Sequence, residues 1–167
     1  SAASDVYKRQ VIIPARYASS RLPGKPLKDI AGMPMIQRVW QQAVKSRASR
    51  VVIATDDSRI QSAALLFGAE VCMTREDHVS GTDRLQEVAS VLNLDDSQLV
   101  VNVQGDEPVI NPRDILKILK EKQSNPNKVI CGYTEILKSE NPLDSNLVKV
   151  VFNKEKKLIY CSRSIIP

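Results

Sequence analysis

Short apolar runs alternate with longer amphipathic stretches over most of the chain. A short run bounded by polar residues is typical of a strand that is buried on both faces of a sheet. The predicted strands are 11–13, 51–54, 70–73 and 99–103. After each strand, apolar residues recur every three or four positions, which predicts an amphipathic helix. The segments with this spacing are 36–44, 60–67, 85–92 and 115–119.

This alternation predicts an α/β fold. Successive strand–helix units favour a Rossmann-like, mostly parallel sheet with helices on both faces. The pattern changes after about residue 128, where 129–137 is predicted to be a further strand. Segments 147–152 and 158–162 flank a polar turn at 153–156, which predicts an antiparallel hairpin. We therefore expect antiparallel C-terminal strands beside the parallel sheet.

Polar residues mark where the helices are expected to begin. Asp56 or Asp57 is placed to cap the second helix, and Thr82 is placed to cap the third. Asn111 followed by Pro112 is a typical start for the fourth. The adjacent Asp56 and Asp57 are also compatible with a metal-binding pair, but their position directly before a helix favours the capping role.

Composition excludes several classes of protein. With 167 residues, 43% apolar, the chain is long enough to bury a core of its own. No apolar run approaches the roughly 20 residues that span a bilayer, so we expect no membrane segment. Twenty-four basic against 19 acidic residues give a net charge of +5, and aromatic residues make up 4%. This modest, unclustered charge with few aromatics argues against nucleic-acid binding and is compatible with small anionic ligands.

The cysteines and the chain ends carry less information. Cys72, Cys131 and Cys161 are far apart and lack metal-binding spacing, so we expect reduced packing residues of a cytosolic protein. Residues 1–10 show no periodicity and no initiating Met, which predicts a non-native or disordered leader. The sequence stops directly after a strand-like run, and we expect a chain that is incomplete at its C-terminus.

The strongest chemical signal is the loop at 14–27, which follows the first predicted strand. It contains three cations, Arg16, Arg21 and Lys25, separated by small residues. Small residues let main-chain N–H groups approach phosphate oxygens, and the cations neutralise their charge, so the loop predicts a triphosphate site. Neither a Walker A motif nor a Gly-x-Gly-x-x-Gly turn is present. The alternative is a solvated basic surface loop.

Several motifs in order resemble the CMP-Kdo synthetase family, the 3-deoxy-manno-octulosonate cytidylyltransferases. The first is Ile-Pro-Ala-Arg-Tyr-Ala-Ser-Ser-Arg-Leu-Pro-Gly-Lys-Pro-Leu at 13–27, and another is Val-Asn-Val-Gln-Gly-Asp-Glu-Pro at 101–108. The remaining motifs lie at 54–57, 71–75, 78–84, 148–151 and 160–167. The resemblance therefore covers nearly all of the chain after residue 10. It implies a single nucleotidyltransferase domain over 11–167, of the nucleotide-diphospho-sugar transferase type.

The resemblance also implies roles for individual residues. Ligands of such sheets bind at the carboxyl ends of the strands, and Asp106, which follows a predicted strand, is implied to hold Mg²⁺ on the nucleotide phosphates. Arg16, Arg21, Lys25 and Asp106 are the implied catalytic residues. The implied nucleotide contacts are Ala15, Arg16, Lys25, Arg75, Ser80, Gly81, Gln104 and Asp106, with the base and ribose near Arg75, Ser80 and Gly81.

Two positions differ from the usual family pattern. Val79 stands where a Gln is usual, which removes a polar side chain from the implied base site, and Asp83 stands where a Glu is usual. His78, the only histidine, has no nucleophile motif near it, and we expect it to form hydrogen bonds within the loop beside the nucleotide rather than to act as a base.

The implied reaction joins CTP and the sugar acid Kdo to give CMP-Kdo and pyrophosphate, for lipopolysaccharide biosynthesis in the cytoplasm. The full-length form is implied to be a homodimer. By resemblance, a second metal ligand and most of the sugar-acid pocket lie in a C-terminal region beyond residue 167. The alternative is a non-catalytic nucleotide- or sugar-binding fragment of the same fold.

Overall fold

The computed structural model describes residues 8–18 and 22–166. The contacts divide the chain into two compact units, Ser1–Ile130 and Cys131–Pro167. The single domain over 11–167 stays a prediction. Of the predicted leader, residues 1–7 lie outside the described residues, whereas Arg9 and Gln10 already belong to the first strand. Gln10 pairs with β4 and β6, and Arg9 pairs with β6.

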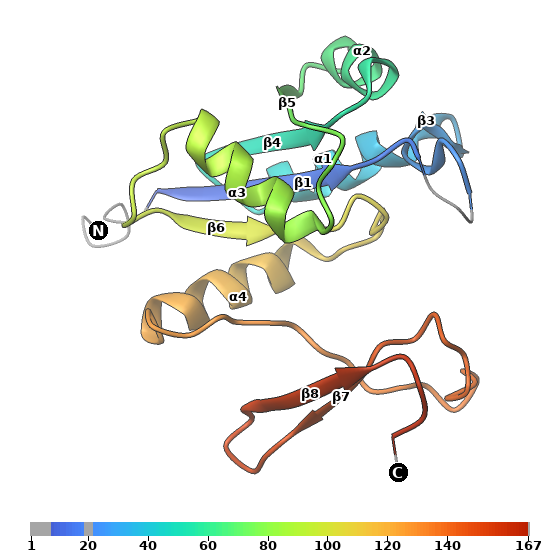
Figure 1. Cartoon of the computed structure of the whole chain (residues 1–167), viewed down its shortest axis with the longest axis vertical. Helices are drawn as coiled ribbons and strands as arrows, with labels where there is room; N and C mark the ends of the chain where they lie inside the picture. Colours follow the sequence, from blue (N-terminus) through green and yellow to red (C-terminus); the bar gives the residue numbers. More distant parts are fainter. Residues whose placement is uncertain (1–7, 19–21, 167) are drawn as a thin grey trace. The chain divides into compact units, whose positions relative to one another are not determined.

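The first unit contains a four-stranded parallel sheet (Figure 1). Its strands are β1 (Arg9–Ala15), β4 (Arg50–Thr55), β5 (Glu70–Met73) and β6 (Leu99–Asn102). Their order is β5-β4-β1-β6, and all neighbouring pairs are parallel. β1 is central and its residues 11–13 are fully buried, as an apolar run with sheet neighbours on both sides requires. The predicted parallel sheet is confirmed.

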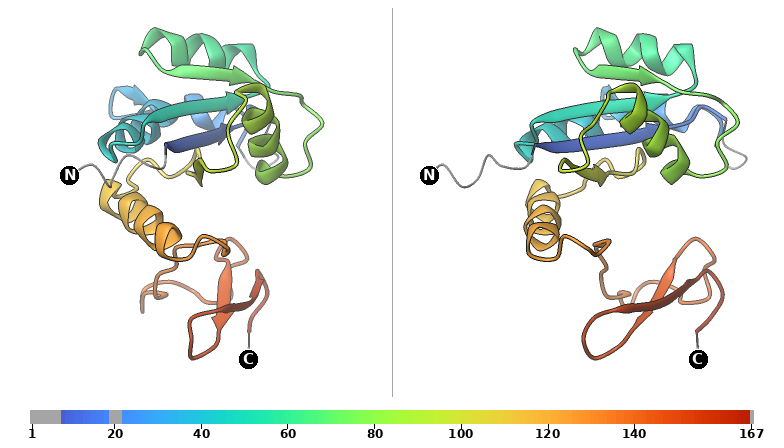
Figure 2. Two further views of the ribbon diagram at one scale, coloured as in Figure 1. Left: turned by 90° about the vertical axis from the view of Figure 1, so that its left-hand side faces the viewer. Right: turned by 60° about the vertical axis from the view of Figure 1, so that its left-hand side comes forward.

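Helices cover both faces of this sheet, as predicted (Figure 2). They are α1 (Met35–Lys45), α2 (Ser58–Leu66), α3 (Gly81–Val91) and α4 (Pro112–Ser124). Because strand side chains alternate between faces, Ile13 packs with α1, α2 and α4, whereas Ile12 packs with α3. The two buried clusters therefore hold the helices on opposite sides.

The helix starts follow the sequence prediction at two positions and depart from it at one. Asp57 caps α2 by accepting a hydrogen bond from Arg59 N, 2.9 Å, and Asn111 caps α4. Thr82 does not cap α3, because it already lies in the first helical turn. Ser80 is the N-cap instead, since its extended backbone directs the hydroxyl to Asp83 N at 3.2 Å.

Between β1 and α1 the chain forms short elements that the sequence pattern does not reveal. A single 3₁₀ turn, η1 (Lys25–Leu27), precedes the two-residue strands β2 (Asp29–Ile30) and β3 (Met33–Pro34). The turn between β2 and β3 uses positive φ at Ala31 and Gly32. Elements this short bury few apolar residues and leave no periodicity in the sequence.

The second unit contains the predicted hairpin, β7 (Lys149–Phe152) paired antiparallel with β8 (Leu158–Ser162). The predicted strand at 129–137 is wrong, because these residues form no strand ladder in the structure. An apolar run becomes a strand only where an edge is available for main-chain pairing. Cys72 is buried as predicted, but Cys131 and Cys161 are exposed and do not act as packing residues.

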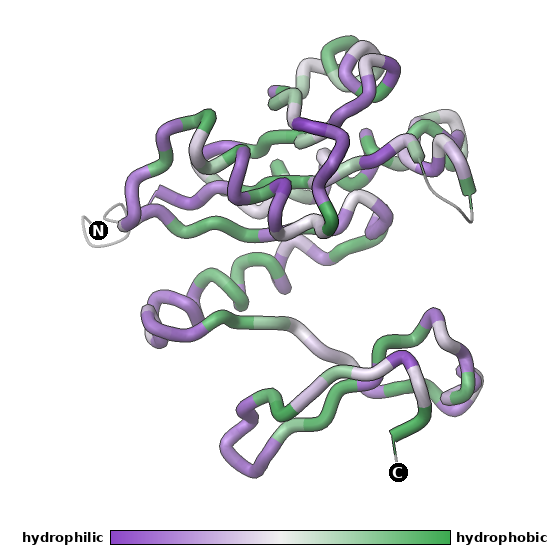
Figure 3. The backbone as a smooth tube through the Cα atoms, in the orientation of Figure 1, coloured by the Kyte–Doolittle hydropathy of each residue, from purple (hydrophilic) through white to green (hydrophobic). Residues whose placement is uncertain are grey.

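Figure 3 shows the apolar stretches of the sheet strands and, in contrast, a mostly polar connection at 74–80 between β5 and α3. Among the described residues, no helix combines the length and the apolar character that crossing a membrane requires.

Candidate active site

A cavity of about 400 Å³ opens at the carboxyl edge of the sheet. Its walls come from the loop after β1, the start of η1, the first turn of α3 and the loop after β6. The lining residues belong to segments 14–18, 25–26, 79–84 and 104–106. In a parallel sheet these loops meet at one edge, so residues about 90 positions apart in the sequence face the same space.

Lys25 and Asp106 meet in this cavity. Lys25 Nζ donates to Asp106 Oδ2 at 2.7 Å, and the two side chains are 37% and 50% exposed. A half-exposed ion pair of this kind contributes little to stability, because water screens both charges. Each partner is therefore available to a charged ligand: the ammonium for an anion and the carboxylate for a cation.

A turn at Gly24 directly precedes Lys25. Gly24 has φ of +68°, a left-handed conformation that favours glycine, and its N–H donates to Tyr17 O at 2.9 Å. The Arg59 guanidinium lies over the Tyr17 ring, 3.3 Å from its centroid. The Gly24 N–H bond therefore joins Gly24 to Tyr17, and the Arg59 contact joins Tyr17 to the start of α2.

Gly105 lets the loop after β6 approach the end of β1. A Cβ atom at this position would lie 2.6 Å from Pro14 O, which is closer than side chains come to a carbonyl oxygen. Glycine is therefore required here by a close approach of two main chains, not by an unusual φ angle. This approach sets Asp106 opposite Lys25.

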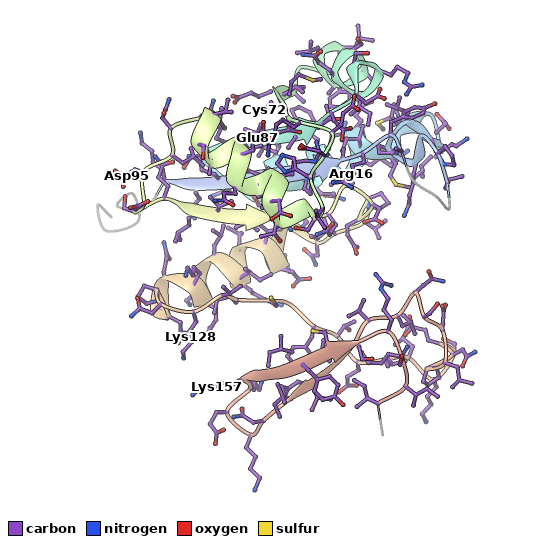
Figure 4. All side chains as sticks on the ribbon, in the orientation of Figure 1. Arg16, Cys72, Glu87, Asp95, Lys128 and Lys157 are labelled. Atoms are coloured by element: carbon purple, nitrogen blue, oxygen red, sulfur yellow. The ribbon has the colours of Figure 1, made fainter. Side chains whose placement is uncertain are left out.

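Arg16 lines the cavity and is tied to the β5–α3 loop (Figure 4). Its guanidinium Nη2 donates to the main-chain oxygen of His78. The His78 ring in turn bonds Glu87 on α3, and this hydrogen bond holds the pKa of the Glu87 carboxyl below its ordinary value. His78 thus forms hydrogen bonds to α3 and to the loop after β1; a place beside a nucleotide remains a prediction.

Arg84 is a cavity residue that the sequence analysis missed. It is fully buried, and its guanidinium donates to Thr74 Oγ1 and to Asp56 Oδ2. Asp56 follows β4 and Thr74 follows β5, so Arg84 joins the carboxyl ends of two strands to α3. Asp56 is therefore an ion-pair partner, while Asp57 has the predicted capping role. A signal was present: Arg84 lies four residues before Val88, within the apolar stripe of α3.

Comparisons with known proteins identify the family. A sequence profile described as cytidylyltransferase matches residues 10–167. The chain belongs to the cytidylyltransferase family. It is 50% identical to the 3-deoxy-manno-octulosonate cytidylyltransferase of Ruthia magnifica, over 94% of the chain and 64% of that protein. The corresponding protein of Cellvibrio japonicus is 52% identical over 94% of the chain and 62% of its own length.

A solved structure of this family is also similar. It is CMP:2-keto-3-deoxy-manno-octonic acid synthetase complexed with CTP, with a TM-score of 0.80 and 41% identity, covering 96% of this chain and 66% of that one. The cytidylyltransferase fold predicted from the sequence is therefore shown. The chain spans less than two thirds of the length of the curated relatives above.

The cavity of this family member gathers most of the residues expected to bind nucleotide. Ala15, Arg16, Lys25, Ser80, Gly81, Gln104 and Asp106 all line it. Arg75 does not: it lies in a neighbouring hollow on the other side of Val79, with its side chain 3.4 Å from Asp77 Oδ1. Arg21 lies outside the described residues. The individual roles of all these side chains stay predictions.

Ser80 and Asp83 form a reciprocal capping box at the start of α3. Asp83 Oδ2 accepts from Ser80 N at 3.0 Å and from Ser80 Oγ at 2.7 Å, while Ser80 Oγ accepts from Asp83 N. The hydroxyl of Ser80 is therefore already engaged within the helix start. These bonds from Ser80 lower the pKa of the Asp83 carboxyl below its ordinary value of 3.8.

The capping box predicts a specific loss of stability in acid. Because the Asp83 pKa is lower in the folded than in the unfolded chain, the carboxylate stabilises the fold above pH 3.8 and loses this effect as the pH falls further. Asp83→Asn should lower the melting temperature at pH 6, and the difference from the original chain should shrink toward pH 3. Thermal unfolding followed by circular dichroism measures both; an equal difference at the two pH values would contradict the assignment.

Asp106 fits a magnesium site that is completed by substrate. No group of three or more His, Cys, Asp or Glu side chains within the described ranges could hold a metal. Magnesium in nucleotide enzymes commonly takes one or two carboxylates together with phosphate oxygens and water. A single accessible carboxylate beside a cation-lined cavity has this donor chemistry, so Asp106 is the residue that would hold the ion.

Proposed function

We propose that this chain carries the nucleotide-binding part of an enzyme that transfers the cytidylyl group of CTP to 3-deoxy-manno-octulosonate (Kdo). The observation that supports the proposal is the Lys25–Asp106 pair, which faces into one cavity with a separation of 2.7 Å. A triphosphate needs a cation at its oxygens and a carboxylate that can share a magnesium ion. The cavity supplies the cation from the loop after β1 and the carboxylate from the loop after β6.

The proposed reaction is an in-line displacement at the α-phosphorus. The anomeric hydroxyl oxygen of Kdo forms the new bond to phosphorus, the bond to the β-phosphate oxygen breaks, and pyrophosphate leaves while the hydroxyl proton passes to solvent. In such transfers most of the rate enhancement comes from positioning and charge neutralisation. Asp106 would hold a magnesium ion, which would neutralise part of the phosphate charge.

The protein's own groups divide the nucleotide between two ends of the cavity. Lys25, released from Asp106, donates to phosphate oxygens, and Arg16 adds positive charge from the same loop. At the other end the α3 start contributes Ser80 and Gly81 to the cavity lining, while Asp83 lines the neighbouring hollow. In this proposal the base and ribose lie at that end, beside Ser80 and Gly81.

For the whole protein we propose a cytoplasmic homodimer whose product, CMP-Kdo, is used in lipopolysaccharide biosynthesis. A second candidate is a fragment of the same fold that binds nucleotide without turnover. Pyrophosphate release from CTP, Kdo and magnesium distinguishes them, with calorimetric CTP binding measured alongside. The test uses the 167-residue chain. CTP binding without pyrophosphate release would support the second candidate, and absence of both binding and release would refute the proposal.

The phosphate role of Lys25 has its own test. Lys25→Ala should weaken CTP binding about 10- to 100-fold, the usual value of a hydrogen bond to a charged group. Lys28→Ala is the matched control, because Lys28 is an exposed lysine of the same loop that does not line the cavity. Titration calorimetry on folded protein measures both. If the Lys25 and Lys28 variants bound CTP with equal affinity, Lys25 would not be a phosphate-binding residue.

A further inference from the structure

The segment Arg75–Ser80, here called the β5–α3 loop, separates two hollows of the surface. Val79 and Ser80 line the candidate active site, while Arg75, His78 and Val79 line the neighbouring hollow along α3. The segment contains no helix or strand. Its shape must therefore come from side-chain contacts rather than from main-chain ladders.

One carboxylate oxygen supplies two of these contacts. Glu87 Oε2 accepts from Arg75 N at 3.1 Å and bonds the ring Nε2 of His78. The His78 side chain is 5% exposed and that of Glu87 is 23% exposed, so water does not readily replace either partner. Because Arg75 and His78 lie three residues apart, the shared carboxylate folds the loop back onto α3.

The main chain of His78 contacts a residue of the candidate active site. Its main-chain oxygen accepts from Arg16 Nη2, so His78 is held through its ring by α3 and through its carbonyl by the loop after β1. The loop therefore has a defined path, and that path ends at Ser80 and Gly81, which line the cavity. Glu87 itself does not line the cavity and lies behind the loop.

We infer that Glu87 is a positioning residue, which orders the β5–α3 loop so that the loop binds the nucleoside end of the nucleotide. The inference rests on the proposed function. It assigns Glu87 no contact with the ligand: its effect passes through Arg75 and His78. At the phosphate end, Lys25 and Asp106 pair with each other and take no part in this network, so binding there should depend on Glu87 much less, through Arg16 alone.

The test compares two ligands that contain the nucleoside, CTP and CMP, with one that contains only phosphate. Glu87→Ala should weaken binding of CTP and of CMP by the same factor, about five- to tenfold, because both contain the nucleoside. Binding of inorganic tripolyphosphate should stay within about twofold. Glu87→Gln keeps an acceptor for Arg75 N and should show a smaller loss. Gln86→Ala is the matched control, since Gln86 is an exposed neighbour on the same helix.

A double-mutant cycle identifies the path of the effect. If Glu87 acts through His78, the double variant Glu87→Ala/His78→Ala should bind CMP as tightly as whichever single variant binds it less tightly. Independent effects would instead multiply the two fold-losses in affinity. The inference would be overturned if Glu87→Ala bound CMP as tightly as the original chain, or if it lost the same factor of affinity for CMP and for tripolyphosphate. Either result would leave the proposed function unaffected. If the original chain bound neither CTP nor CMP, the proposed function would fall, and this inference with it.

Discussion

Asp106→Asn is expected to lower magnesium-dependent formation of CMP-Kdo by about 100- to 1,000-fold, the usual effect of removing one preorganised group that stabilises developing charge. Asparagine keeps the shape of the side chain but removes the charge that faces Lys25 at 2.7 Å. Pyrophosphate release by the complete protein measures the effect. Glu107→Gln, a change at the adjacent exposed carboxylate outside the cavity lining, should leave the rate within about threefold.

Calorimetric measurement of CTP affinity in the same variant distinguishes a loss of metal binding from a general loss of activity. Without magnesium, Asp106→Asn should bind CTP at least as tightly as the original chain, because Lys25 no longer has to leave its carboxylate partner. With magnesium, the original chain should gain affinity and the variant should not. A variant that retains full turnover, or that gains as much affinity from magnesium as the original chain, would refute Asp106 as the metal ligand.

Arg84→Met is expected to lower the free energy of unfolding by about 3–5 kcal/mol. The methionine fills part of the space but leaves the Asp56 carboxylate, 13% exposed, without its cationic partner. Urea unfolding followed by circular dichroism measures the change. Arg113→Met, at an exposed arginine on α4, should stay within about 0.5 kcal/mol of the original chain.

Removing both charges should be less harmful than removing one. The double variant Asp56→Asn/Arg84→Met leaves no buried carboxylate unpaired, so it should recover at least about 1 kcal/mol relative to Arg84→Met alone. If Arg84→Met cost less than about 1 kcal/mol, or if the double variant were the less stable of the two, the buried pair would not be holding β4, β5 and α3 together.

Much of the parallel sheet follows from local pattern. The spacing of apolar residues in each strand–helix unit is visible within its own segment of the sequence. The caps Asp57 and Asn111 accept hydrogen bonds from N–H groups only two residues away. Even the meeting of Lys25 and Asp106 could be anticipated, since residues that follow parallel strands share one edge. The cap of α3 could not be predicted from local pattern alone. Ser80 and Thr82 both carry hydroxyls, and Ser80 is the N-cap because its backbone is extended.

Contacts between distant segments account for what the pattern did not show. Arg84 is buried because Asp56 and Thr74, 28 and 10 residues earlier, receive its guanidinium. Likewise, 129–137 has strand composition but forms no strand ladder.

The sequence by itself determined the order of the elements, the buried faces of β1 and the charges that follow the strands, because these depend on neighbours within a few residues. Tertiary structure alone decided that Glu87 lies behind His78, that Gly105 lets Asp106 reach Lys25, and that Arg84 is enclosed. Those outcomes depend on which surfaces meet once the chain is closed, and no single segment contains that information.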